Sequence, residues 1–134
     1  MPAQVLVIED DQHLRAEILD FLVRRRNLVR SCRTLGEAEQ ALSEIEPDVI
    51  VSDIHLPDGD GATFCMTHAH RHPKAKWILM SGNQELVRQG NQLKGISDMP
   101  AFAVVDKPVP LRLLDRFIQA ATPSIVAAAP PIVA

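Results

Sequence analysis

Short apolar runs alternate with stretches of helical periodicity along nearly the whole chain, and this alternation constrains the fold more than any other feature. An apolar run of four or five residues between turn signals is typical of a strand buried on both faces. Apolar residues that recur three or four positions apart indicate an amphipathic helix. The predicted strands are residues 5–8, 28–32, 49–51, 77–80 and 102–105. The predicted helices are residues 12–25, a segment between Thr34 and Pro47, residues 62–71, a weaker one within 83–99, and residues 111–121.

Five strands that alternate with five helices predict an α/β fold, in which a parallel sheet carries helices on both faces and the crossovers are right-handed. The common order for a five-stranded doubly wound sheet is 2-1-3-4-5, the flavodoxin-like arrangement, with its switch point between strands one and three. A chain of 134 residues suits one domain. We assign residues 1–121 to that domain and residues 122–134, rich in alanine and proline, to a tail or linker.

Composition narrows the classes of function. With 46% hydrophobic and 23% charged residues the chain resembles an ordinary soluble protein, and no apolar stretch reaches the ~20 residues of a membrane span. The net charge of -3 and the scattered basic residues argue against direct nucleic-acid binding. No basic segment followed by a long apolar core marks a secretory signal, so we expect a cytoplasmic protein without membrane contact.

Acidic residues stand where two of the predicted strands end. Glu9 and Asp10 follow the first strand, and Asp53 follows the third. The carboxyl ends of these strands meet at the switch point of the sheet, where doubly wound folds bind ligands. Like charges at close range repel by about 4 kcal/mol per pair at an effective dielectric near 20, so the cluster calls for a cation. An all-oxygen set of ligands suits Mg²⁺.

The exit loops of strands four and five add two polar groups to the same rim, Ser81 and Lys107. A hydroxyl can donate a hydrogen bond to a phosphoryl oxygen, and an ammonium can neutralise another. Together with the carboxylates, these residues predict a site that accepts a phosphoryl group.

Other acids and caps receive structural interpretations. We expect Asp11 to cap the first helix rather than to bind a metal. Thr34 and Glu37 match a capping box at the start of the second helix. Asp58 and Asp60 flank a glycine in the loop after Asp53, where turn chemistry is the leading explanation.

Four segments, each closing a predicted strand, occur in the order found in one known family. The segments are LVIEDD, VIVSDIHLPDGDG, ILMSG and VVDKPV, and with them residues 4–121 resemble a response-regulator receiver domain of two-component signalling. The resemblance implies that Asp53 is the phosphoacceptor and that Glu9, Asp10, Asp53 and the main-chain carbonyl of His55 bind Mg²⁺. It also implies that Lys107 and Ser81 stabilise the phosphoryl group and that the bond before Pro108 is cis.

The resemblance further implies a switch rather than an enzyme, with limited self-catalysed phosphotransfer and autodephosphorylation. The expected donor is a sensor histidine kinase or a histidine phosphotransfer protein. An output domain or a downstream protein is the expected recipient of the signal, and a homodimer is a further expected form. Two positions that vary in the family and tune hydrolysis of the phosphoryl group are occupied here by His55 and Asn83.

One position departs from the family. The strand-five aromatic that reports phosphorylation is expected three residues before the lysine, where this chain has Val104. Phe102 lies two residues earlier and, by the period of a strand, on the same face. We therefore expect Phe102 or a movement of the fourth helix to take over that role.

Three alternatives remain open. The chain could be a receiver-shaped docking module that does not depend on phosphate, an option that Val104 favours. DGDGATF is similar to the motif of haloacid-dehalogenase-like phosphatases, but Ala62 separates the glycine from Thr63 and the spacing fails. Finally, Cys65, His68 and His72 share one helix face, as in a soft-metal site, although packing in the core is the favoured interpretation of Cys65 and His68.

Overall fold

Five parallel strands form the central sheet of the computed structural model, which describes residues 3–82 and 100–122. They are β1 (Gln4–Ile8), β2 (Leu28–Cys32), β3 (Val49–Asp53), β6 (Lys76–Ser81) and β7 (Ala101–Asp106). The order across the sheet is β2-β1-β3-β6-β7, and all the pairs are parallel. The predicted order 2-1-3-4-5 is therefore confirmed, with the switch point between β1 and β3.

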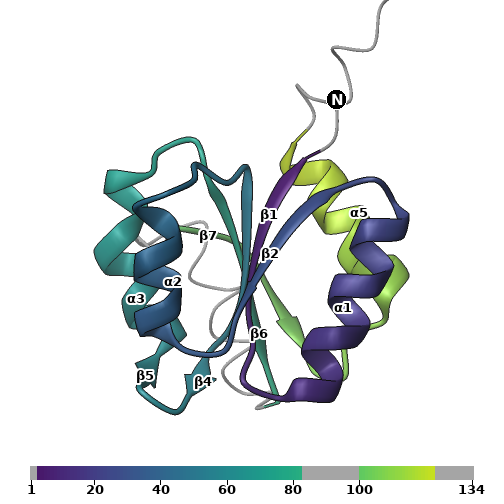
Figure 1. Cartoon of the computed structure of the whole chain (residues 1–134), viewed down its shortest axis with the longest axis horizontal. Helices are drawn as coiled ribbons and strands as arrows, with labels where there is room; N and C mark the ends of the chain where they lie inside the picture. Colours follow the sequence, from purple (N-terminus) through teal and green to yellow (C-terminus); the bar gives the residue numbers. More distant parts are fainter. Residues whose placement is uncertain (1–2, 83–99, 123–134) are drawn as a thin grey trace, which may run out of the picture.

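Helices cover both faces of the sheet (Figure 1). On one face lie α1 (Gln12–Arg24) and α5 (Leu111–Ala121), and on the other lie α2 (Leu35–Leu42) and α3 (Gly61–His68). A 3₁₀ turn, η1 (Ala69–Arg71), follows α3, so the end of the helix predicted for residues 62–71 is tighter than an α-helix. The predicted helix within 83–99 and the tail after Thr122 lie outside the described residues.

Each strand contributes to two hydrophobic cores because alternate side chains point to opposite faces. In β1, Val5 and Val7 pack toward α1 and α5, whereas Leu6 and Ile8 pack with residues of α2 and α3. All four are fully buried. A strand buried on both faces reads as a continuous apolar run, which explains why the sequence pattern located it.

A bulge in β7 overturns one sequence-based expectation. The register pairs Trp77 with Ala101 but Ile78 with Ala103, so β7 holds one residue more than β6 at this point. Phe102 packs against the core beside α1 and α5, while Val104 belongs to the core beside α2 and α3. The two side chains therefore face opposite sides of the sheet. The expectation that Phe102 shares a face with Val104 was wrong, because strict alternation does not survive a bulge.

Side chains cap the first turns of α1, α2 and α3, whereas α5, which follows Pro110, has no side-chain cap. Asp11 accepts a hydrogen bond from the Leu14 amide at 3.0 Å and caps α1, as predicted. Thr34 accepts from the Glu37 amide at 3.1 Å and caps α2. The carboxylate of Glu37 accepts from the amide of Arg33 rather than from that of Thr34, so the reciprocal half of the capping box is displaced by one residue.

A small antiparallel hairpin, β4 (His55–Leu56) and β5 (Gly59–Asp60), replaces the predicted loop between β3 and α3. Asp60 caps α3 through the amides of the two residues after Gly61. Asp58, at the hairpin turn, accepts from the amides of Leu35 and Gly36 at 2.9 and 3.0 Å. The hairpin is thereby joined to the first turn of α2. Among the described residues, no helix is long and apolar enough to cross a membrane.

Candidate functional site

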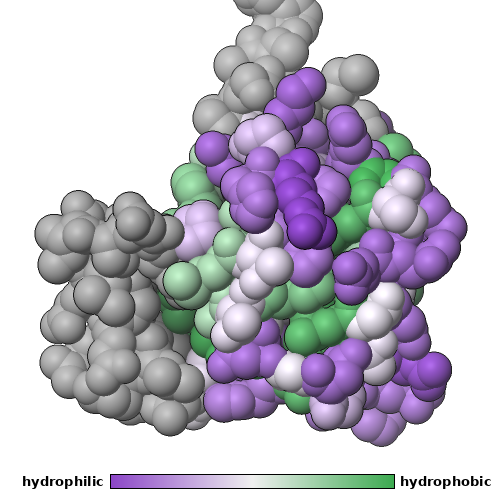
Figure 2. Space-filling model, turned by 90° about the vertical axis from the view of Figure 1, so that its left-hand side faces the viewer, coloured by the Kyte–Doolittle hydropathy of each residue, from purple (hydrophilic) through white to green (hydrophobic). Residues whose placement is uncertain are grey.

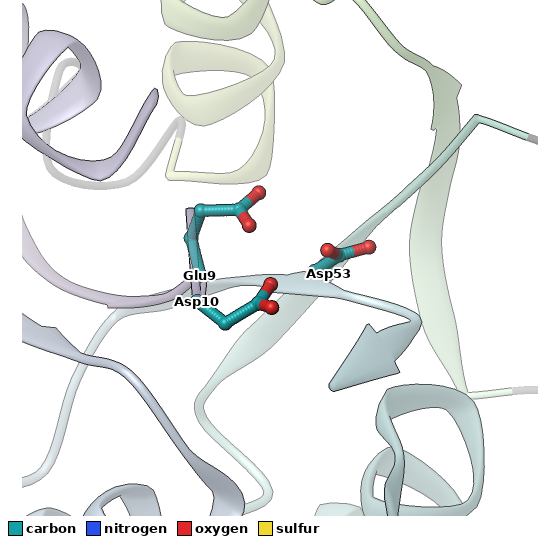
Figure 3. A group of neighbouring side chains, drawn as sticks. All are labelled: Glu9, Asp10 and Asp53. Carbon is teal, nitrogen blue, oxygen red and sulfur yellow. The ribbon is translucent and has the colours of Figure 1, made fainter. Parts of the chain in front are cut away.

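Three carboxyl groups meet at the carboxyl edge of the sheet, where β1 and β3 lie side by side. Glu9 and Asp10 follow the last residue of β1, and Asp53 is the last residue of β3. One oxygen from each lies within 4.8 Å of the others. Figure 3 shows the three side chains turned toward a common space. Glu9 and Asp53 are buried and Asp10 is exposed, so the cluster opens to solvent on one side.

Lys107 brings a positive charge to this cluster from the loop after β7. Its Nζ atom lies 2.9 Å from Oε1 of Glu9 and donates a hydrogen bond to Oδ2 of Asp53 at 3.0 Å. Burial alone would lower the pKa of Lys107, but the two carboxylates outweigh it and the net shift is upward. The lysine is therefore held in its charged form. The peptide bond between Lys107 and Pro108 is cis.

Glu9 is the carboxylate of the cluster whose negative charge is disfavoured by its surroundings. Its side chain is fully buried, and burial, together with repulsion from Asp53, raises its pKa above the ordinary value. Oε2 accepts a hydrogen bond from the Asp11 amide at 3.1 Å. Oε1 has the ammonium of Lys107 close by but, among the described residues, no partner in hydrogen-bond geometry.

The donor set fits a magnesium ion. One carboxylate oxygen from each of the three residues lies close to the others, and Glu9 contributes a buried side chain whose Oε1 has, among the described residues, no partner in hydrogen-bond geometry. Mg²⁺ prefers oxygen ligands, commonly one or two carboxylates with several waters, and the exposed side at Asp10 leaves room for water. Glu9, Asp10 and Asp53, three of the four ligands predicted from the sequence, are thus brought together by the fold, and the His55 carbonyl stays a prediction.

An arginine that sequence reasoning missed holds the main chain under the acidic pair. Nη1 of Arg15, on α1, donates to the carbonyl oxygen of Glu9 at 2.9 Å and approaches that of Asp10 at 3.4 Å. Both carbonyls lie where the chain leaves β1 and turns into α1. The spacing of six residues from Glu9 is the signal that could have indicated it, because it returns a long side chain from the first turn of α1 to the strand end.

The segment around Asp53 is held by hydrogen bonds to its neighbours. Ser52 Oγ donates to the carbonyl oxygen of Asp53 at 2.9 Å, and the amide of Ile54 donates to the carbonyl of Met80 at 2.9 Å. The chain returns close to Asp53 at Gly61, where a Cβ would lie 2.1 Å from that same carbonyl oxygen. Only a residue without a side chain fits there.

The remaining predicted site residues are placed as follows. Ser81 is the buried last residue of β6, one position beyond the residue that pairs with Asp53. The amide of His55 donates to Oδ1 of Asp53 at 3.3 Å, and the His55 side chain is exposed. Asn83 lies outside the described residues.

The suspected soft-metal trio is not assembled as the helix pattern suggested. Cys65 is fully buried in the core beside α2 and α3, and burial raises the pKa of its thiol to about 12. A thiol in this state is a poor metal ligand. His68 is also buried, whereas His72 follows η1 and is half-buried.

The site combines the buried Asp53 carboxylate, the ammonium of Lys107 and a cluster of carboxylate oxygens open to solvent. Carboxylates can act as nucleophiles toward phosphorus, and cations stabilise the charge that spreads over a transferring phosphoryl group. The arrangement is therefore suited to phosphoryl transfer onto Asp53.

Two curated relatives align with most of this chain. It is 29% identical over 118 residues to the DNA-binding transcriptional regulator NtrC of Proteus hauseri, which covers 85% of this chain and 24% of the relative. It is 29% identical over 119 residues to the response regulator protein PilR of Pseudomonas aeruginosa, covering 88% of this chain and 26% of the relative. The chain thus spans about a quarter of the length of these relatives.

Solved structures share the fold. The beryllofluoride-activated NtrC4 receiver domain dimer superposes with a TM-score of 0.77 at 24% identity, covering 90% of this chain and 97% of that one. A receiver domain from Clostridium thermocellum gives a TM-score of 0.79 at 23% identity, covering 94% and 98%. The family model of the response regulator receiver domain matches residues 5–119. With the fold and the matched span in agreement, the chain belongs to the response regulator receiver domain family of two-component systems.

Proposed function

We propose that Asp53 accepts a phosphoryl group and that the domain acts thereby as a Mg²⁺-dependent signalling switch. The observation that carries the proposal is the contact of the buried Asp53 carboxylate with the ammonium of Lys107, beside the carboxylates of Glu9 and Asp10. A structural ion pair needs one carboxylate for one lysine. The two further acids are explained if a cation and an incoming phosphoryl group share the site.

In the proposed step, a carboxylate oxygen of Asp53 attacks the phosphorus of a phosphohistidine on a sensor histidine kinase or a histidine phosphotransfer protein. A P–O bond forms, the P–N bond breaks, and the leaving imidazole keeps the electron pair of that bond. The product on Asp53 is an acyl phosphate. Asp53 is suited to this role because its main chain is held by Ser52 and by β6.

Neighbouring residues take the charge of the product. Lys107 already lies 3.0 Å from the acceptor and can turn its ammonium to a phosphoryl oxygen. Ser81, at the end of the adjacent strand, is proposed to donate its hydroxyl to another. When held by Glu9, Asp10, Asp53 and the main-chain carbonyl of His55, Mg²⁺ supplies positive charge that offsets the negative charge of the phosphoryl group.

Persistence of the phosphoryl group sets the duration of the signal. We propose that His55 and Asn83, the residues at the two hydrolysis-tuning positions, let the acyl phosphate persist longer than an acid at position 83 would, because neither is a carboxylate that orients water. An output domain, a downstream protein or a second copy of the domain is proposed to read the phosphorylated state. Slower phosphate release from Asn83→Asp than from the wild-type chain would contradict the tuning role.

The decisive experiment incubates the chain with a small acyl phosphate and Mg²⁺ and follows its intact mass. We expect wild type to gain one phosphoryl group that hydroxylamine removes, and Asp53→Ala to gain none. Asp20→Asn, an exposed acid on α1, is the matched control and should behave as wild type. Equal labelling of Asp53→Ala would overturn the assignment. Absence of labelling in wild type would favour a docking module, and steady turnover of phosphomonoesters would favour a phosphatase.

A further inference from the structure

A hollow lies between the last turn of α2 and the end of α3, at the edge of the sheet opposite the carboxylate cluster. Both helices begin beside the β4–β5 hairpin and run away from it (Figure 1). Figure 2 looks onto the face that they cover, where hydrophilic residues gather at the end at which the helices finish. The hollow has a volume of about 240 Å³ and is lined by Glu39, Leu42, Ser43, His68, Arg71 and His72.

His68 is held so that one ring nitrogen is left unused. Its ring stacks on Phe64 at 3.9 Å, and Nδ1 lies 3.0 Å from the carbonyl oxygen of Phe64. A carbonyl can accept but not donate, so Nδ1 carries the hydrogen and Nε2 of the neutral ring keeps its lone pair. Nε2 is buried and, within the described part of the chain, has no hydrogen-bond partner.

A carboxylate stands opposite that lone pair. Oε1 of Glu39, on α2, lies 3.9 Å from Nε2 of His68, which is too far for a hydrogen bond. The Glu39 side chain is 66% exposed and can move, whereas the His68 residue is 8% exposed and fixed. One rigid nitrogen ligand thus faces one adjustable oxygen ligand across the hollow.

We propose that this hollow binds a divalent transition-metal ion such as Zn²⁺, with Nε2 of His68 and the carboxylate of Glu39 as the first two ligands and His72 as the third. Zn–N and Zn–O bonds of about 2.0–2.2 Å at a tetrahedral angle place the two ligand atoms about 3.4 Å apart. The observed 3.9 Å therefore needs to close by a small movement of Glu39. His72 must rotate into the hollow that it already lines, and water completes the site.

The chemistry of the donors decides which ion fits. An imidazole that donates its other N–H to a main-chain carbonyl is the usual arrangement around a histidine ligand of zinc, because the hydrogen bond orients the ring. Mg²⁺ disfavours nitrogen ligands, so it would stay with the three carboxylates at the other end of the sheet. An anion would meet the lone pair of His68 and the charge of Glu39. Arg71, which would repel a cation, is exposed and can turn toward solvent.

Calorimetric titration with Zn²⁺ tests the site. The full chain carries Asp10→Asn and Asp53→Asn as a common background, so that the carboxylate cluster does not compete. We expect one Zn²⁺ per chain, and a Kd at least tenfold higher after Glu39→Gln or His68→Gln, with a smaller rise after His72→Gln. Co²⁺ in place of Zn²⁺ should give visible absorption bands that the first two changes remove.

His70→Gln is the matched control, because His70 is exposed and does not line the hollow. Its Zn²⁺ affinity should equal that of the background chain. Glu39→Gln decides the question if His68→Gln fails to fold, since Glu39 is a surface residue. Absence of saturable binding, or equal Kd values for the background chain and Glu39→Gln, would refute the metal site.

Discussion

The ammonium of Lys107 lies 3.0 Å from Oδ2 of Asp53, a residue 54 positions earlier in the chain, and 2.9 Å from Oε1 of Glu9. Lys107→Gln removes the ammonium that lies against both carboxylates. We expect the free energy of unfolding at neutral pH without divalent ions to fall by about 1–3 kcal/mol, less than for a fully buried pair because Lys107 is partly exposed. Chemical denaturation measures the change.

The same variant should respond more strongly to magnesium. Mg²⁺ no longer competes with an ammonium for Glu9 and Asp53, so the rise in Tm on adding Mg²⁺ should be larger in Lys107→Gln than in wild type. Lys76→Gln, at an exposed lysine on β6, is the control. Equal effects of Mg²⁺ on both variants would contradict the competition.

Glu9 makes stability depend on pH. Its pKa is raised, mainly by burial, so between its ordinary value of 4.5 and the raised value the folded state binds more protons than the unfolded state. The free energy of unfolding therefore falls as pH rises through that window. Glu9→Gln removes this cost and keeps an oxygen for the Asp11 amide. Without Mg²⁺ the variant should be more stable than wild type at pH 7, and the difference should vanish below pH 4.5.

Thermal unfolding across this pH range provides the measurement. Glu17→Gln, an exposed acid on α1, should leave the pH profile of wild type unchanged. A Glu9→Gln profile parallel to that of wild type at every pH would show that Glu9 does not titrate with a raised pKa.

Arg15 positions the acidic pair through the main chain. Arg15→Gln removes its hydrogen bond to the Glu9 carbonyl, so the two carboxylates lose their alignment. Arg15 is half-buried, so solvent screens its positive charge, and the loss of that charge should be the smaller effect. We expect the Kd for Mg²⁺ to rise by about tenfold, as for other residues that orient metal ligands.

Calorimetric titration with Mg²⁺ measures this Kd, and two further variants serve as a partial rescue and as a control. Arg15→Lys keeps a donor and should restore part of the affinity. Arg24→Gln removes an exposed arginine of the same helix and should have none of the effect. If Arg15→Gln binds Mg²⁺ as wild type does, the contact is structural and has no bearing on the metal.

Substitution of alanine at two glycines near the site, Gly61 and Gly82, should have opposite effects. A Cβ at Gly61 would lie 2.1 Å from the Asp53 carbonyl oxygen, whereas a Cβ at Gly82 would meet no atom within 4 Å. Gly61→Ala should lower the free energy of unfolding by about 1–3 kcal/mol through overpacking and slow phosphoryl transfer to Asp53. Gly82→Ala should leave both unchanged. Denaturation and the acyl phosphate assay measure these effects, and equal behaviour of the two variants would contradict the close approach.

The placement of Glu9, Asp10 and Asp53 followed from sequence because it needs only the order of the strands. Parallel strands deliver their carboxyl ends to one edge, so residues far apart in the chain meet there whatever the details of packing. The same reasoning placed Ser81 and Lys107 at the ends of β6 and β7. Buried apolar runs and helix periods were sufficient evidence for the fold.

Contacts that depend on tertiary pairing escaped prediction. Arg15 resembles any solvated helix residue until the strand end beside it is known. Asp58 bonds to amides 22 and 23 positions away, and its neighbour Gly59 suggested a local turn instead. The bulge at Phe102 arises from the pairing of β7 with β6, which single-strand alternation cannot express.

The bulge also changes how a mutational scan of β7 should be interpreted. In a regular strand, all odd-numbered side chains pack into one core and all even-numbered side chains into the other. Here Ala101 and Val104 contact one core, while Ala103 and Val105 contact the other. The rule that odd positions share one core therefore fails once within the six residues of β7. An alignment that counts backward from Lys107 by twos assigns the correct face at Val105 and Ala103 but fails at Ala101. Homologues without the bulge would therefore need a gap at this point before their core positions could be compared with those of this chain.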